Sequence, residues 1–137
     1  NGYKWVIDYT KEDVVAKVKE ITKGKGVPVV YDGVGKDTWA ASLDSLQPRG
    51  LMCSFGNASG AVPPQPPVIL TAKGSLYLTR PTLATYTAKR EDLIARANDL
   101  FEVVASGVPA GLGEWRAGTT ISCAFCRSSR PGSNGSG

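Results

Sequence analysis

The chain has 137 residues, of which 42% are hydrophobic, a length and composition that suit one globular α/β domain and exclude a two-domain enzyme. Its net charge is +4, but its lysine and arginine residues form no basic stripe, so we expect no nucleic-acid binding. The sequence shows no apolar run long enough to cross a membrane and opens with no secretory signal, and we therefore expect a cytoplasmic location.

Histidine is absent, which excludes Ser-His and Cys-His catalysis and histidine-ligated metals. Cys53 lies in an apolar run and is predicted to be a buried thiol. Cys123 and Cys126 have the spacing of half a zinc site, but a structural zinc needs four ligands, so we expect no metal. The sequence also offers no nucleophile or acid-base pair, and we name no catalytic residue.

Strand and helix patterns alternate through the first part of the chain. β-forming residues predict a strand over 5–9, and Thr10 is a plausible N-cap for a helix with an apolar stripe that reaches Ile21. An uninterrupted apolar run predicts a buried strand over 27–31. Asp37 can cap a second helix, which we expect to extend through Leu46.

A third buried strand is predicted over 51–55, followed by a loop and a proline-rich stretch. Further along, the pattern indicates a strand over 75–79 and a long helix over 89–106 with one apolar face. Residues 109–137 have little apolar periodicity and are predicted to be disordered. Strands joined by helices of about ten residues pair in parallel, so the fold class is α/β with an open, doubly wound sheet.

Ligands of such sheets bind beyond the carboxyl ends of the strands, where this chain places three suitable segments. Two are glycine-rich loops, 32–35 and 56–60, and the third is 79–81, where a strand ends on Arg80. Asp32 could bind a ribose hydroxyl or cap its own turn, and Arg80 could recognise a phosphate or carboxamide or remain a solvated surface residue.

Several segments together resemble a known family. They include the sequence from Phe55 to Gly60, which reads Phe-Gly-Asn-Ala-Ser-Gly, and the Thr-Arg-Pro sequence at 79–81. With 6–9, 19–22, 29–35 and 73–78, they resemble the zinc-independent, zeta-crystallin-like quinone oxidoreductases of the medium-chain dehydrogenase/reductase superfamily. The resemblance covers residues 3 to about 108.

The resemblance implies a partial Rossmann-type domain that binds NADPH and an enzyme that passes hydride to a quinone. It places 1–80 in the nucleotide-binding domain and 81–108 in a segment that returns towards the catalytic lobe, while 109–137 match nothing in the family. It also implies a homodimer through the edge formed by 75–79. Tyr86 is then a substrate contact, and the implied cofactor contacts are Tyr9, Gly33, Val34, Phe55, Gly56, Asn57, Thr79, Arg80 and Pro81.

The sequence also departs from the family. Many relatives have serine where Gly33 stands, and the family's glycine-rich phosphate loop and its first lobe have no counterpart here. We therefore interpret the chain as an internal fragment and expect it to bind NADPH weakly by itself. Two alternatives stay open: a reductase of enoyl or enal double bonds on the same fold, and a non-catalytic fragment that dimerises.

Overall fold

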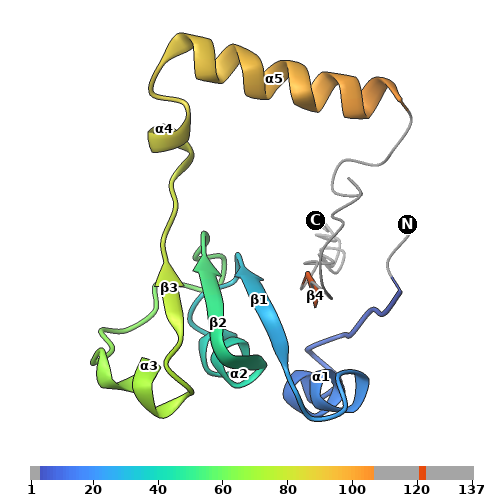
Figure 1. The fold of residues 1–137 in the computed structure, drawn as a ribbon, viewed down its shortest axis with the longest axis vertical. Coiled ribbons are helices and arrows are strands. Elements are labelled where there is room, and N and C mark those ends of the chain that lie inside the picture. Colours follow the sequence, from blue (N-terminus) through green and yellow to red (C-terminus); the bar gives the residue numbers. More distant parts are fainter. Residues whose placement is uncertain (1–3, 107–120, 123–137) are drawn as a thin grey trace, which may run out of the picture.

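The computed structural model describes residues 4–106 and 121–122. It contains a four-stranded sheet with the order β3-β2-β1-β4, in which each neighbouring pair is parallel (Figure 1). The strands are β1 Val27–Asp32, β2 Leu46–Ser54, β3 Tyr77–Thr79 and β4 Ile121–Ser122. The predicted α/β class with a parallel sheet is confirmed.

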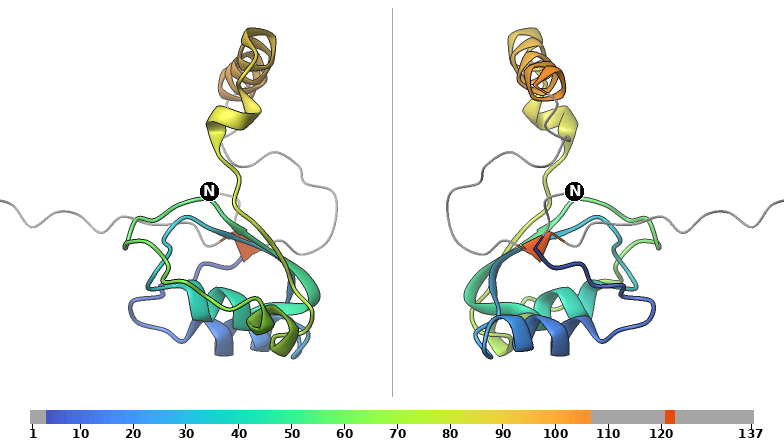
Figure 2. Two further views of the ribbon diagram at one scale, coloured as in Figure 1. Left: turned by 90° about the vertical axis from the view of Figure 1, so that its left-hand side faces the viewer. Right: turned by 90° about the vertical axis from the view of Figure 1, so that its right-hand side faces the viewer.

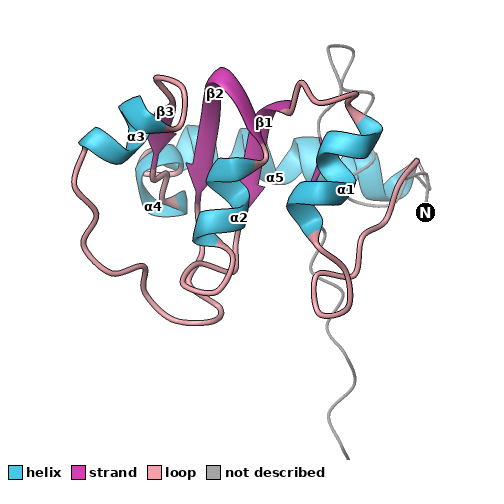
Figure 3. Ribbon diagram, turned by 90° about the horizontal axis from the view of Figure 1, so that it is seen from below, coloured by secondary structure: helices cyan, strands magenta, loops and turns pink. Residues whose placement is uncertain are grey.

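The hydrophobic core lies between the sheet and two helices, α1 Val14–Ile21 and α2 Trp39–Asp44. Figure 3 shows α2 beside β1 and β2, the strands against which it packs. The apolar runs predicted to be buried strands supply Val27, Val30 and Met52 to the core, as expected for parallel strands covered by helices. The buried cluster is Val18, Val27, Val30, Leu43, Leu46, Met52 and Leu76.

The start of the chain differs from the prediction. Residues 5–8 form no strand, because they have no ladder partner in the part of the chain that the structure describes. The N-cap of α1 is Asp13 rather than Thr10, since the Asp13 carboxylate accepts a hydrogen bond from the Ala16 amide at 3.0 Å. Thr10 instead donates its hydroxyl to the Asp8 carboxylate at 2.6 Å.

The boundary between α2 and β2 also falls earlier than predicted. Thr38, not Asp37, is the N-cap of α2, and Leu46 belongs to β2. The Ser45 carbonyl, just before β2, accepts a hydrogen bond from the Val27 amide at 2.9 Å, which draws the residues after α2 into the sheet. Proline and glycine near Arg49 concealed this strand in the sequence pattern, because both usually mark a break.

Beyond β2 the chain contains two short helices that the sequence did not predict, α3 Val68–Ala72 and α4 Leu83–Tyr86. The predicted long helix is confirmed as α5 Arg90–Ala105. None of its residues is buried, and its apolar stripe, which includes Phe101, lies exposed. Figure 2 shows α4 and α5 standing clear of the sheet.

The prediction of disorder over 109–137 falls outside the described residues, except at β4. There Ile121 and Ser122 pair with Val30 and Tyr31 along the edge of β1. Cys123 and Cys126 also lie outside the described residues. Within 4–106 and 121–122, no helix is long and apolar enough to cross a bilayer.

Candidate functional site

Asp32, the last residue of β1, organises the turn that follows it. Its buried carboxylate accepts hydrogen bonds from the Val34 amide at 2.8 Å and the Gly35 amide at 3.0 Å. The same carboxylate accepts from the hydroxyls of Thr38 at 2.8 Å and Ser42 at 2.7 Å. With only 3% of the residue exposed, this geometry supports the turn-capping interpretation of Asp32 and not a ribose contact.

The two glycine-rich loops at the carboxyl ends of β1 and β2 are joined by backbone hydrogen bonds. Amides of the second loop donate to the first, from Ala58 to the Gly33 carbonyl at 3.2 Å and from Ser59 to the Val34 carbonyl at 2.8 Å. The Ser59 hydroxyl donates to the same Val34 carbonyl at 2.8 Å. The structure therefore brings the predicted contacts of both loops into one surface, which we call the carboxyl edge.

Glycine is required where these loops meet. A Cβ atom on Gly56 would lie 2.3 Å from the Gly33 carbonyl oxygen, and one on Gly35 would lie 2.7 Å from the Gly60 carbonyl oxygen. Gly35 also has a φ of +92°, which side chains disfavour. A Cβ on Gly33 would meet the Phe55 ring at 3.1 Å, so the ring lies close over this glycine.

The end of β3 joins the same edge. Thr79 is in register with Cys53 of β2, and Arg80 donates from Nη1 to the Ser54 carbonyl at 2.7 Å. This contact holds the guanidinium at the end of β2, while the residue itself remains exposed. Phe55 follows Ser54 and is 54% exposed, which leaves an aromatic ring accessible at the carboxyl edge.

Two predicted contacts lie outside this cluster. Tyr9 is half-buried in a turn before α1 that is held by local hydrogen bonds, among them the Lys11 amide to the Asp8 carbonyl at 2.9 Å. Tyr86 ends α4, is 66% exposed, and stands apart from the sheet with that helix (Figure 1).

The turn that carries Tyr9 is expected to respond to acid. The Thr10 hydroxyl and the Lys11 ammonium lower the pKa of the Asp8 carboxyl from 3.8 to about 2. Because the folded-state pKa is lowered, the ionised carboxylate stabilises the turn above pH 3.8, and this contribution is lost as the pH falls through about 2. We expect the Thr10 amide resonance to titrate with a midpoint near pH 2 and this titration to vanish in Asp8→Asn. A midpoint near the ordinary value of 3.8 would contradict the assignment.

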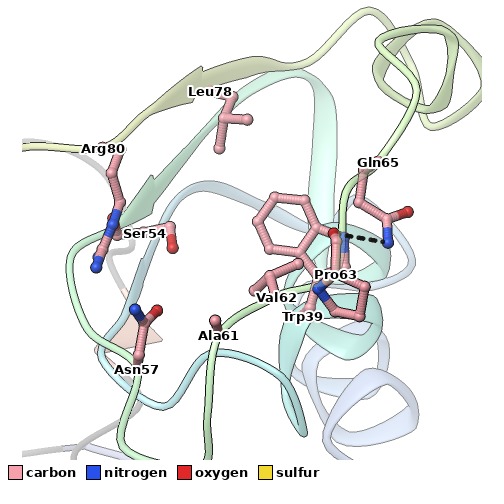
Figure 4. Close-up of a pocket in the computed structure, with 9 residues that line it drawn as sticks. All are labelled: Trp39, Ser54, Asn57, Ala61, Val62, Pro63, Gln65, Leu78 and Arg80. Carbon is pink, nitrogen blue, oxygen red and sulfur yellow. Dashed lines mark hydrogen bonds between the residues drawn. The ribbon is translucent and has the colours of Figure 1, made fainter.

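A pocket of about 350 Å³ opens beside the carboxyl edge, between β2, β3, the start of α2 and the loop after β2 (Figure 4). Sequence patterns had placed Ser54 and Leu78 within strands and Trp39 on a helix stripe, and they gave no sign that these side chains meet. One feature of the sequence could have indicated the pocket: Ser54 places a hydroxyl group at the end of an apolar strand. The lining residues are Trp39, Ser54, Asn57, Ala61, Val62, Pro63, Gln65, Leu78 and Arg80.

The comparisons with known proteins point to one family. The model of the zinc-binding dehydrogenases matches residues 1–102. A quinone oxidoreductase of Salmonella typhimurium is 61% identical over 103 residues, which cover 75% of this chain and 32% of the relative. A 2-haloacrylate reductase of Burkholderia is 44% identical over 108 residues, 78% of this chain and 32% of the relative.

A solved structure gives the same result. The Escherichia coli quinone oxidoreductase complexed with NADPH superposes with a TM-score of 0.75 at 58% identity, over 78% of this chain and 33% of that one. The chain thus spans about a third of the length of these relatives. Despite the family's name, residues 4–106 and 121–122 contain no group of three metal-ligating side chains. The chain belongs to the zinc-binding dehydrogenase family, within the medium-chain dehydrogenase/reductase superfamily.

Proposed function

We propose that this chain forms part of the nucleotide-binding domain of an enzyme that transfers reducing equivalents from NADPH to a quinone. The carboxyl edge carries this proposal, because its two glycine-rich loops and Arg80 meet beyond the carboxyl ends of parallel strands, where such sheets bind their ligands. The similarity to quinone oxidoreductases, one of them solved with NADPH, supports the choice of cofactor and substrate.

Each residue of the carboxyl edge has a binding or orienting role in this proposal. The exposed Phe55 ring offers a face for a flat heterocycle, and Gly56 lets the second loop pack against Gly33 of the first, which holds that ring in place. Arg80, held by the Ser54 carbonyl, presents its remaining N–H groups to a carboxamide or phosphate. Bound NADPH would supply the hydride. The other proposed cofactor contacts are Tyr9, Gly33, Val34, Asn57, Thr79 and Pro81, with Tyr86 proposed for the substrate.

The proposal extends to assembly and location. β3 is an edge strand of the described sheet, and its Tyr77 and Leu78 side chains are exposed, which supports pairing with a second copy over 75–79. Cys53 is a free, buried thiol, as suits a reducing cytoplasm. The proposed domain organisation assigns 1–80 to the nucleotide-binding domain, 81–108 to the return towards a catalytic lobe, and 109–137 to a tail.

A chimera tests the cofactor role directly. Residues 4–106 of this chain would replace the matching third of the Escherichia coli quinone oxidoreductase, and NADPH-dependent reduction of 1,4-benzoquinone would be followed. We expect activity to be retained, and Phe55→Ala to raise the KM for NADPH about tenfold by removing the ring face. The control Lys25→Ala, at an exposed residue of the α1–β1 turn, should leave this KM unchanged. A folded chimera without NADPH-dependent activity would refute the cofactor role.

The substrate needs a separate experiment, since the chimera borrows its substrate pocket from the host. The native protein would be captured from its source with an antibody against 85–106 and assayed with NADPH on benzoquinone and on an enone. A higher kcat/KM for benzoquinone is expected. A preference for the enone would favour the double-bond reductase, towards which the 2-haloacrylate reductase similarity points. Inactivity on both would favour the non-catalytic alternative.

A further inference from the structure

The strand β1 has a long neighbouring strand on one side and a short one on the other. In the sheet order β3-β2-β1-β4, β2 pairs along the whole of β1, whereas β4 pairs with it at Val30 and Tyr31 (Figure 1). A strand edge without a neighbour offers its backbone to other extended segments and so promotes aggregation. Since β1 consists mainly of valine and tyrosine, which form strands readily, its outer edge needs protection.

Pro28 protects the first half of this outer edge. The backbone amides of a strand point alternately to its two neighbours. The Val27 amide donates to the Ser45 carbonyl at 2.9 Å, on the side of β2, so the next position faces the outer edge. Proline stands at that position and has no amide to donate, as is common in edge strands.

The strand β4 covers the second half of the outer edge. Val30, which follows Pro28 at the next outward-facing position, directs its backbone N–H and C=O to the same side as that proline. There it is in register with Ile121, and the next pair in the ladder is Tyr31 with Ser122. Among the described residues, the proline and β4 thus protect both outward-facing positions in the middle of β1.

We propose that β4 is a strap that covers the outer edge of β1 and keeps this edge from pairing with strands of other copies of the chain. The strap acts through the backbone and involves neither the carboxyl edge nor NADPH. Because its ladder with β1 is short, it opens locally more readily than the ladder between β1 and β2, and the outer edge is then free to pair. Association of the chain is therefore expected to depend on whether β4 is in place.

A double variant, Ile121→Pro with Ser122→Pro, tests the strap in the full 137-residue chain without any ligand. Proline has no amide to donate, so both β4 amides are removed and the strand is lost. In sedimentation equilibrium at equal protein concentrations, we expect the average mass of the variant to be about twice that of the unchanged chain or more, because the freed edge pairs with other copies. The control Ile121→Val keeps the amide and a β-forming residue, and its mass should equal that of the unchanged chain.

Matched lysine substitutions identify the edge through which the variant associates. Lysine on an edge strand opposes pairing, so Tyr31→Lys on β1 should bring the mass of the double proline variant down to that of the same chain without the prolines. Tyr77→Lys places the same charge on β3, and there the prolines should still raise the mass about twofold. This comparison separates the strap from the dimerisation proposed for 75–79. An unchanged mass in the double proline variant, or association that only Tyr77→Lys relieves, would overturn the proposal.

Hydrogen exchange provides a second measurement that needs no variant. In the unchanged chain at low concentration, the strap should slow exchange of the Val30 amide about tenfold or more relative to an unstructured peptide. Exchange of this amide at the rate of a free peptide would show that β4 leaves the edge uncovered, and it would contradict the proposal even if the double proline variant did not fold. The far-ultraviolet circular dichroism of each variant verifies folding.

Discussion

Replacing Gly56 by alanine is expected to lower the free energy of unfolding of the 137-residue chain by about 2–3 kcal/mol. The new Cβ would lie 2.3 Å from the Gly33 carbonyl oxygen and 2.7 Å from the Gly33 Cα. These are backbone atoms, so no rotamer change relieves the contact and the two loops must separate. Urea unfolding followed by tryptophan fluorescence measures the loss. In the chimera, Gly56→Ala should also raise the KM for NADPH.

Gly24→Ala provides the matched control for this variant. Gly24 has a φ of +82° but open space around its missing side chain, so the substitution adds conformational strain without a steric contact. Its expected cost is about 1 kcal/mol, and the KM of the chimera for NADPH should not change. Equal losses of stability in the two variants, with unchanged KM in both, would show that the close contact of the loops is unimportant.

Asp32→Ala is expected to lower the free energy of unfolding by about 3–5 kcal/mol. The substitution removes the shared acceptor of two amides, at Val34 and Gly35, and two hydroxyls, at Thr38 and Ser42. These donors are left in a buried setting, where an unsatisfied polar group is costly. The measurement is the same urea titration. The turn before α2 should also lose protection against hydrogen exchange.

Asp37→Ala distinguishes this network from a general effect of removing negative charge. Asp37 is exposed, and its turn contact with the Ser59 hydroxyl at 3.0 Å uses the backbone amide, which alanine keeps. A change within about 0.5 kcal/mol is expected. If Asp32→Ala were equally mild, Asp32 would not organise the turn, and its interpretation as a ligand residue would regain support.

The sequence predicted the parts of the fold that depend on local pattern. The uninterrupted apolar runs around Val30 and Met52 indicated parallel buried strands, and the glycines of both loops indicated close backbone approach, as the structure has them. The stripe around Leu100 likewise predicted the long helix α5. These features follow from residue type and spacing, which a single sequence contains.

What the sequence missed depends on contacts between distant segments. The β-forming residues 5–9 satisfy the propensity of a strand, but a strand also needs a partner, which propensity cannot show. Thr38 follows the glycine-rich loop 32–35, and only the structure shows its hydroxyl donating to the Asp32 carboxylate. The pocket joins Trp39 and Leu78, which are far apart in sequence and have no shared pattern.

The exposed setting of α5 has a consequence for cooperativity. Helix formation has a costly nucleus, and a helix of 16 residues is only marginally stable in water without tertiary packing. Since none of its side chains is buried, α5 depends on its own backbone hydrogen bonds and on Glu91 and Asp92 near its positive N-terminal dipole. We therefore expect α5 to unfold locally before the sheet does, with its amides exchanging faster than those of β1 and β2.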